Sequence, residues 1–473
     1  VSTTMHFMPG CEILQSFDLV HWEHVTYVYE TLDHTDAQQL KSGQNIYGQG
    51  MWAASLRYHE GRFYICFVAN DTRKTYLYTS EKIDGPWKKQ LIEGFYHDGS
   101  LLFDEDGRNY IVYGNDEIWI TELNEDLTAP KKDGLHRLLV SDHKNPELGY
   151  EGSHIQKING YYYIFLIHSL RDRWMRTEAC FYSDSLEGEF TGGDVLCDDR
   201  GYCGQGVAQG GIVDTPDGKW YAMLFQDSGA VGRIPILLPV TWKDHFPFFG
   251  QNGHVPEEIE VHSTRPGYIY QPLVGSDDFC NGLLPRWQFN HDPDPRYYHL
   301  DALQGTYTIT TREVCTELTQ AVNTLTQRMS YPSCAAEVTV DASALKEGDV
   351  AGLCALQSCY AAVGITKHHG KYEVLMLDKK EDGILDMTEG TVVESHQMDF
   401  RLEADFCNMK DEARCYYRVN KGDWLPIGTV HKLYFKLDHF TGCRFGLFCY
   451  AAEETGGSAC FRDFKYYDVD EIS

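Results

Sequence analysis

The sequence lacks several features that would define a function class at once. No two cysteines are separated by two residues, and no cysteine or histidine spacing is typical of a zinc site. No apolar run approaches the roughly 20 residues that a membrane span needs. Basic residues are scarce, with 41 Lys and Arg against 70 Asp and Glu, which gives a formal net charge of -29. We therefore expect no membrane span and no nucleic-acid partner, because a phosphate-binding protein needs a basic face.

The number and spacing of the cysteines indicate the redox state of the compartment in which the protein works. The 15 cysteines are odd in number, and ten of them lie after residue 279. We do not expect a disulfide framework in a chain of 473 residues with so many unpaired candidates. Because the cysteines are scattered along the chain, we expect buried thiols that act as small apolar side chains in a reducing, cytoplasmic compartment. Helical periodicity is absent as well, which favours an all-β protein.

The sequence does contain a β-hairpin pattern that repeats four times. Each copy has a short strand, a tight turn with a glycine and a second, strongly apolar strand, and a tyrosine stands three residues after the glycine. The turn glycines are Gly61, Gly107, Gly160 and Gly218. Repeats of this kind are typical of a β-propeller in which each hairpin forms the inner half of one blade.

A second recurring pattern predicts the outer halves of the blades. It consists of apolar residues, a serine and an aromatic residue six or seven positions later, with looser versions further along. Its copies lie at 13–22, 77–87, 118–130, 181–190 and 236–242. Five outer halves against four inner halves predict a five-bladed propeller whose first inner strand lies upstream of Val1.

The repeat ends where turn-forming residues cluster, and this divides the chain. We assign residues 1–271 to the propeller, 272–278 to a linker and 279–473 to a second domain. Short alternating strands without a repeat, such as those at 335–340 and 371–377, predict a β-sandwich for the second domain.

One position is shared by every inner strand. Nine residues before the four turn glycines stand Trp52, Asp98, Glu151 and Gln209, and all four should point toward the central axis. A core position would be apolar in every copy. Two acids, an amide and an indole instead predict a binding or catalytic cavity, since buried acids are costly without a role or a partner. The simpler alternative is that Asp98 and Glu151 only cap turns.

Seven motifs occur in a characteristic order along nearly the whole chain. They lie at 8–22, 51–56, 98–103, 151–154, 231–233, 284–290 and 323–328. Together they resemble glycoside hydrolase family 43, in particular its β-xylosidases and α-L-arabinofuranosidases with a C-terminal concanavalin-like sandwich. The resemblance implies an acid, an aspartate that tunes the pKa of the acid, and an aspartate base. By position these are Glu151, Asp98 and a residue of the first inner strand, which this sequence does not contain.

The resemblance also suggests residues that bind the sugar. Arg233 looks toward sugar hydroxyls in such proteins, and we expect it to be the basic partner of Asp98, unless it is a structural surface arginine. Trp52 is expected to form one wall, because a pentose presents an apolar face that stacks on indole, and Phe7 another. Simple packing near the axis is the alternative for Trp52.

Gln209 departs from the family pattern. Many members have a histidine at this position, often beside a central calcium. We therefore expect Gln209 to contact substrate, and we expect no metal and no required cofactor. The basic and aromatic segment 171–176 is interpreted as a solvated loop rather than part of the cavity rim.

These observations predict an exo-acting, inverting hydrolase that releases terminal xylose or arabinose from xylo-oligosaccharides or arabinoxylan. A second hypothesis is a lectin-like, carbohydrate-binding pseudoenzyme on the same fold, because the base is absent from the chain and its loss should slow hydrolysis by roughly 10² to 10⁴. A third is a propeller that recognises proteins, which predicts an exposed apolar face instead of axial acids.

Overall fold

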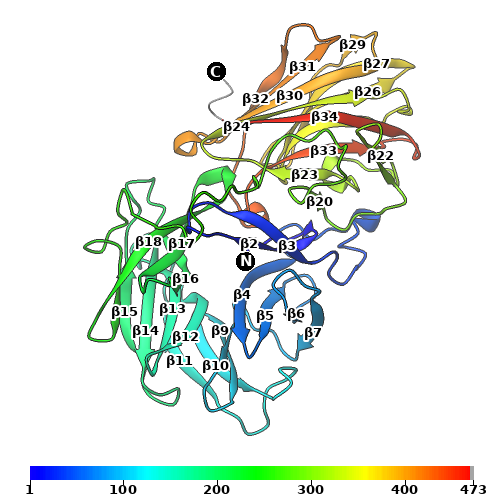
Figure 1. Cartoon of the computed structure of the whole chain (residues 1–473). Coiled ribbons are helices and arrows are strands. Elements are labelled where there is room, and N and C mark those ends of the chain that lie inside the picture. Colours follow the sequence, from blue (N-terminus) through cyan, green and yellow to red (C-terminus); the bar gives the residue numbers. More distant parts are fainter. Residues whose placement is uncertain (469–473) are drawn as a thin grey trace.

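The computed structural model describes residues 1–468, and its regular structure consists of strands and short 3-10 helices (Figure 1). Residues 469–473, the end of the predicted sandwich range, lie outside the described residues. The all-β prediction is confirmed. Within residues 1–468 there is no helix with the length and hydropathy of a membrane span.

Four sheets of four antiparallel strands form the propeller, and each sheet follows the order of the chain. They contain β4 (Met51–His59), β5 (Arg62–Ala69), β6 (Lys74–Ser80) and β7 (Lys88–Ile92); β8 (Ser100–Phe103), β9 (Asn109–Asn115), β10 (Glu117–Leu123) and β11 (His136–Ser141); β12 (Glu151–Ile158), β13 (Tyr161–Ser169), β14 (Arg176–Ser183) and β15 (Thr191–Leu196); β16 (Ala208–Asp214), β17 (Trp220–Asp227), β18 (Arg233–Lys243) and β19 (Phe246–Phe249).

The predicted hairpins are the first two strands of each blade. Gly61 and Gly160 close two-residue turns with φ of 80° and 85°, a backbone region that glycine reaches without strain. The second strands are buried on both faces. Along β13, Ile164 packs with the preceding blade and Phe165 with the following one. This two-sided burial explains why the second strand of each repeat reads as a continuous apolar run.

The prediction of five blades was wrong. Within residues 1–468 the propeller has four blades, and the first predicted outer half forms a separate two-stranded sheet of β2 (Gly10–Gln15) and β3 (Glu23–Tyr29). Beyond this pairing, β2 has one further bridge, in which Ser2 and Glu12 exchange backbone hydrogen bonds of 2.8 and 3.2 Å. The described residues therefore complete no four-stranded blade there. The chain before them turns away: β1 (Phe7–Met8) pairs with β20 (Gln288–Asn290) of the second domain.

Side-chain hydrogen bonds from one arginine join the inner strands of neighbouring blades, a few residues after the axial positions. Arg57 on β4 donates from Nε to the carbonyl of Leu101 at 2.9 Å and from Nη2 to the carbonyl of Ile155 at 2.9 Å. One guanidinium thus connects β4, β8 and β12. Because each bond satisfies a buried donor, the three strands are held in a defined relation around the axis.

The second domain is a sandwich of two antiparallel sheets, as predicted. One sheet contains, in spatial order, β21 (Tyr298–Asp301), β22 (Thr306–Thr310), β34 (Ser458–Asp468), β24 (Ser333–Asp341), β30 (Gln397–Asp405), β31 (Glu412–Val419) and β32 (Leu425–Lys432). The other contains β1, β20, β23 (Leu325–Arg328), β33 (Arg444–Tyr450), β25 (Val350–Leu356), β26 (Ala361–His368), β27 (Lys371–Lys379), β28 (Leu385–Met387) and β29 (Thr391–Val393). Alternate residues of β30 face the shared core, so its sequence has a period of two.

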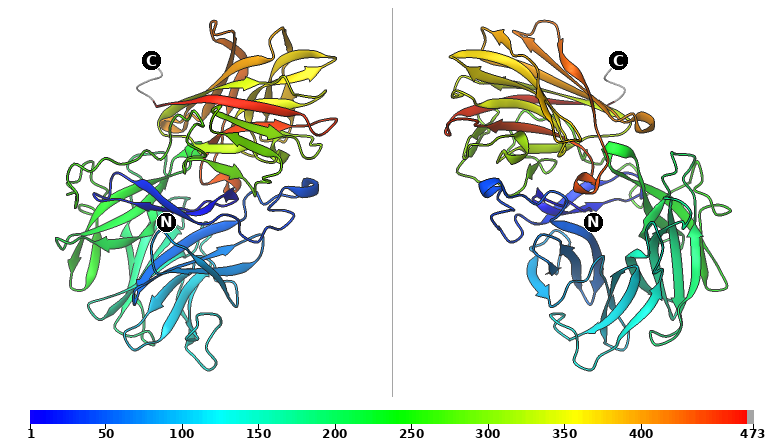
Figure 2. Two further views of the ribbon diagram at one scale, coloured as in Figure 1. Left: turned by 45° about the vertical axis from the view of Figure 1, so that its right-hand side comes forward. Right: turned by 180° about the vertical axis from the view of Figure 1, so that it is seen from behind.

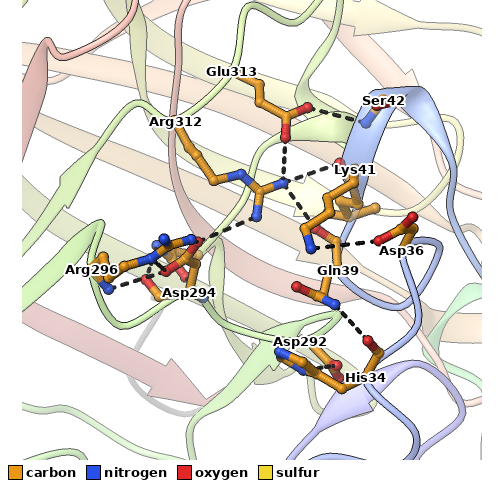
Figure 3. Close-up of polar contacts among 12 residues, drawn as sticks. His34, Asp36, Gln39, Lys41, Ser42, Asp292, Asp294, Arg296, Arg312 and Glu313 are labelled. Carbon is orange, nitrogen blue, oxygen red and sulfur yellow. Dashed lines mark hydrogen bonds and ion pairs between the residues drawn. The ribbon is translucent and has the colours of Figure 1, made fainter.

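The sandwich lies against one side of the propeller, with the dark blue strands β2 and β3 at the junction in every view (Figures 1 and 2). One contact is polar and comes from the loop after β3 (Figure 3). Arg312 Nη2 lies 3.0 Å from Glu313 and donates to the carbonyl of Gln39 at 3.0 Å, and Glu313 accepts from the amide of Ser42 at 3.2 Å. These bonds anchor a propeller loop to the sandwich.

A second contact lies close to the propeller axis. The 3-10 helix η2 (Gly229–Val231) precedes β18, and the Ala230 amide donates to Asp411 Oδ1 at 3.1 Å. The Cys443 amide donates to the Ala230 carbonyl at 2.8 Å. The sandwich segment around Cys443 is therefore fixed beside the start of β18.

Candidate active site

The axial side chains are positioned by irregular strand starts. β-Bulges fall next to the axial residues, between Met51 and Ala54, between Glu151 and His154, and between Ala208 and Gly211. Asp98 lies just before β8 with φ of 47°. Bulges of this kind re-aim side chains near functional sites. Here they turn polar side chains of separate blades toward a common centre.

The structure brings Asp98 and Glu151 together. His97 Nε2 lies 3.7 Å from a carboxylate oxygen of each. The Gly152 amide donates to Asp98 Oδ2 at 3.1 Å, and Asn115 Nδ2 donates to Glu151 Oε2 at 2.7 Å. The side chain of Asp98 is 5% exposed and that of Glu151 21%. One acid is thus held deep in the wall, and the other reaches the solvent side of the same cluster.

Burial and charge set the protonation of this cluster. Burial raises the pKa of Asp98 to about 6; His97 and Arg233 oppose the rise, and the charge of Glu151 adds to it. Burial acts to lower the pKa of His97, but the nearby carboxylates of Glu151 and Asp98 outweigh burial and raise that pKa. The cluster therefore holds an acid that titrates near neutral pH beside an imidazole that keeps its proton more firmly than usual.

Arg233 has a different carboxylate partner from the one predicted. Its Nε lies 3.2 Å from Asp227 Oδ1, and the same carboxylate also binds Arg176 Nη1. The cation in direct range of Asp98 is His97 instead. Arg233 still lies close enough to lower the pKa of Asp98, so its charge faces the acid pair from one side.

Aromatic rings close the site between the two domains. The indole of Trp52 lies 5.9 Å from the His97 ring and 5.6 Å from the Phe440 ring. Phe440 comes from the sandwich, and the guanidinium carbon of Arg233 lies 4.3 Å from the centre of its ring. The second domain thus contributes a wall that the sequence analysis did not anticipate.

Phe7 does not form a wall, contrary to the prediction. It is fully buried in an apolar cluster of the sandwich, and the guanidinium carbon of Arg444 lies 3.7 Å from its ring centre. The reason is the pairing of β1 with β20, which carries Phe7 into the sandwich sheet opposite Asn290.

Gln209 does lie beside the acid pair. Its backbone has φ of 61°, and its amide donates to Glu178 Oε2 at 2.7 Å. A Cβ atom built on Gly152 would come within 2.8 Å of the Gln209 side chain. Gln209 is therefore packed against the residue that follows Glu151. Glu178 is completely buried, and burial raises its pKa well above the ordinary value.

Sequence reasoning missed several neighbours of the acids. Nothing singled out His97, Asn115, Asp227 or Phe440, and Arg176 appeared only as the end of the segment 171–176, which was interpreted as a solvated loop. The adjacency of His97 to Asp98 was a usable signal, because a residue next to an axial acid shares its surroundings. Phe440 carried no such signal, since its position depends on how the domains dock.

The acid cluster is also the sole group of three potential metal ligands close together in residues 1–468. Ligand atoms of His97, Asp98 and Glu151 all lie within 4.8 Å of one another. Calcium prefers six to eight oxygen ligands. Two carboxylates, an imidazole and the nearby Arg233 charge fit that preference poorly, and the set suits proton transfer better.

Comparisons with known proteins agree with this geometry. The model of "Glycosyl hydrolases family 43" matches residues 1–247, and that of "Beta xylosidase C-terminal Concanavalin A-like domain" matches residues 276–467. A beta-xylosidase of Formosa agariphila is 25% identical over 99% of this chain and 85% of its own length. A non-reducing end alpha-L-arabinofuranosidase of Bacteroides ovatus is 23% identical over 82% of this chain and 75% of its own length.

Comparison with solved structures also finds proteins of glycoside hydrolase family 43. A bifunctional GH43-CE protein of Bacteroides eggerthii is 41% identical, with a TM-score of 0.91 over 99% of this chain. The present chain spans 60% of that protein. A GH43 enzyme engineered to display both endo-xylanase and exo-arabinofuranosidase activity is 27% identical, with a TM-score of 0.85 over 99% of this chain and 95% of its own.

Proposed function

The chain belongs to glycoside hydrolase family 43 and is a glycoside hydrolase, and we propose that it releases a terminal xylose or arabinose from xylo-oligosaccharides or arabinoxylan fragments. The observation that carries the proposal is the pairing of Asp98 and Glu151 on neighbouring blades in a site walled by Trp52 and Phe440. Acids and an aromatic wall together suit cleavage of a sugar bond.

Glu151 is proposed as the general acid. Its side chain reaches the solvent side of the cluster, where a glycosidic oxygen can approach it, and Asn115 orients its carboxyl group. A proton delivered to the leaving oxygen as the bond breaks lowers the barrier to departure of the sugar alcohol. The carboxyl of Glu151 must then regain its proton before the next turnover.

Asp98 is proposed to tune that acid. It is held by the Gly152 amide and by His97, and it is too deeply buried to reach substrate easily. When Asp98 is ionised, its charge lies beside the carboxyl group of Glu151 and repels a second negative charge in the cluster. The pKa of about 6 for Asp98 predicts that this effect develops as the pH rises through that value.

Exo action is proposed from the side chains that flank the acids. Trp52, Phe440 and Arg233 approach the acids from both domains, and walls on several sides suit a site that takes the end of a sugar chain. The proposed inverting mechanism also needs a carboxylate base about 6.5 to 9.5 Å from the acid.

Hydrolysis of aryl β-xyloside and aryl α-L-arabinofuranoside tests the proposal. Glu151→Gln should slow an unactivated oligosaccharide by roughly 10² to 10⁴, and a dinitrophenyl glycoside much less, because a good leaving group needs no proton. Glu147→Gln, at an exposed glutamate on the preceding loop, is the matched control. Proton NMR of the first product reports inversion or retention.

Two outcomes would contradict this function. Equal rates for the wild type and Glu151→Gln on every substrate would remove Glu151 from the chemistry. Tight binding of xylo-oligosaccharides without any hydrolysis would instead support the lectin-like hypothesis.

A further inference from the structure

Three fully buried histidines gather around Tyr47 where the two domains meet. His6 precedes β1, His291 follows β20, and His439 ends the 3-10 helix η5 (Leu437–His439) of the sandwich. The centre of the His6 ring lies 4.8 Å from that of His291 and 5.3 Å from that of His439. Tyr47 comes from the propeller loop after β3, and its ring centre lies 4.6 to 5.5 Å from the three imidazoles.

Two of the imidazoles have no hydrogen-bond partner. Both ring nitrogens of His6 and both of His439 are buried and unpaired among residues 1–468. His291 differs, because its Nε2 accepts from the Ile46 amide at 3.0 Å and its Nδ1 donates to Asn290 Oδ1 at 3.1 Å. An unpaired buried polar group costs stability, and an apolar ring would fill the same space without that cost. Packing alone therefore does not explain these two histidines.

The cluster lies directly behind the sandwich half of the aromatic wall. His439 precedes Phe440 in the chain, and its ring packs 5.5 Å from that of Tyr47. The propeller loop approaches η5 closely here, because a Cβ atom built on Gly48 would come within 3.2 Å of Asp438 Cα. The orientation of Phe440 thus depends on how the imidazole before it packs against the loop.

The cluster also lies next to the propeller half of the wall. Met5, which precedes His6, forms a backbone bridge with Met51, and the Met51 amide donates to the Met5 carbonyl at 3.1 Å. Met51 precedes Trp52. A Cβ atom built on Gly50 would come within 2.5 Å of the Met5 carbonyl oxygen, so the two segments are in close contact. Both rings of the wall are therefore one residue away from segments that the cluster holds.

Burial keeps the imidazoles neutral. It lowers the pKa of His291 to about 3 and that of His439 to about 4, and it lowers the pKa of His6 well below the ordinary value. The neighbouring imidazoles and Arg444 lower the pKa of His6 further. At His439, Asp438 opposes the fall and Arg444 adds to it, so burial remains the dominant cause.

Other titratable groups approach the cluster from several elements of the sandwich. They are Asp438 of η5, Arg444 of β33, Cys354 of β25 and Glu317 of the loop after β22. Asp438 Oδ2 already accepts from the hydroxyls of Ser358 and Tyr434. Arg444 is 1% exposed and carries a positive charge, which repels any further positive charge on the imidazoles.

We propose that His6 and His439 are positioning residues for the aromatic wall of the active site: the wall is held while the imidazoles are neutral and loosens in acid, when an opened cluster takes up protons. The inference rests on the proposed function, since it concerns the wall beside Glu151. Because the ordinary pKa of 6.5 applies to an opened imidazole, the support is complete above that pH and is lost as the pH falls through it. At pH 5, each imidazole favours opening by roughly 30-fold.

Kinetics at pH 7.5 test the positioning role. His439→Ala should lower kcat/KM for an aryl pentoside about ten-fold, and His439→Phe, which keeps a ring, should restore most of the loss. His439→Ala combined with Phe440→Ala should be no slower than Phe440→Ala alone, because His439 acts through Phe440. His299→Phe, at an exposed histidine on β21, is the matched control, and thermal melting checks that each variant is folded. Fully additive losses in the double variant would overturn the inference.

Hydrogen exchange tests the acid response without relying on hydrolysis. The amides of Gly442 and Cys443 donate to the carbonyls of His439 and Ala230, so a peptide that covers residues 437–443 reports on the segment around Phe440. After correction for intrinsic rates, its protection in the wild type should fall at least about 30-fold between pH 7.5 and pH 5. The fall should be roughly 30-fold smaller in His439→Phe, which cannot take up the proton.

A change of less than about three-fold in the protection of the wild type would overturn the inference, as would equal falls in the wild type and His439→Phe. If the wild type hydrolyses no aryl pentoside, the proposed function fails instead, and the exchange measurement still decides whether the segment is released by acid. The two failures are therefore distinguishable.

Discussion

The indole of Trp52 meets the ring of Phe440 edge to face, with ring centres 5.6 Å apart and planes at 80°. One ring belongs to the propeller and the other to the sandwich, so the wall of the site exists only when the two domains are docked. Activity should therefore respond to changes in either domain.

Removal of the sandwich ring should impair turnover. Phe440→Ala is expected to lower kcat/KM for aryl xyloside roughly 10- to 100-fold, because it admits water and loosens the sugar beside Glu151. Leu437→Ala, at a 61% exposed residue three positions earlier, serves as the control. Equal kcat/KM for Phe440→Ala and the control would show that the ring is only structural.

Asp98→Asn should trade activity for stability. The folded-state pKa of Asp98 is raised from 3.8 to about 6, so ionising it in the folded protein costs stability. This cost is absent below the unfolded pKa, grows between pH 4 and 6 and is constant above that range. Asp98→Asn should thus be more stable than the wild type by about 1 to 3 kcal/mol at pH 8, with no gain at pH 4.

The same variant should lose activity by roughly 10²-fold on an unactivated oligosaccharide, because Glu151 loses the neighbouring charge. Denaturant unfolding at both pH values and steady-state kinetics provide the two measurements. A stability gain of equal size at pH 4 and pH 8 would contradict the assigned pKa.

His97→Gln should move the acid limb of the pH profile. The charge of His97 lowers the pKa of Asp98, so its removal should raise that pKa. The limb of kcat/KM that reports ionisation of Asp98 should then shift to higher pH by about one unit. A profile that falls at every pH without shifting would indicate a purely structural role for His97.

Domain docking should depend on one buried arginine. Arg312 is 7% exposed and contacts Asp294, Glu313 and the propeller loop at Gln39, as Figure 3 shows. Arg312→Ala should lower the free energy of unfolding by about 3 to 5 kcal/mol, because Asp294 and Glu313 lose a buried partner.

Arg296→Ala is the internal control for this prediction. Arg296 binds the same Asp294 but is 75% exposed, so its loss should cost less than about 1 kcal/mol. Calorimetric melting of both variants measures the difference. Similar melting temperatures would show that the loop contact contributes little to docking.

The inner strands were predictable because they repeat. The position shared by the four hairpins identified Asp98 and Glu151 without any coordinates, and it also identified Gln209 next to Gly152. Periodicity of this kind reflects local geometry, which each blade imposes on its own strands. It therefore carries over reliably from sequence to structure.

Contacts between the domains were not predictable in the same way. Phe7 was expected at the site, yet β1 pairs with β20 and carries it into the sandwich, while Phe440 arrives at the site from the other domain. Nothing in the spacing around either phenylalanine reports a partner hundreds of residues away. The blade count failed for a related reason, since an outer-strand pattern does not show whether β2 and β3 join a larger sheet.

The pairing of β1 with β20 has a practical consequence when the two domains are expressed separately. Strand β1 covers the open edge of a sandwich sheet, with Phe7 opposite Asn290 and Met8 opposite Phe289. A sandwich expressed from residue 276 onward would leave that edge bare, and bare sheet edges recruit other strands. Such a fragment should self-associate, and a synthetic peptide that carries residues 5–10 should suppress the association.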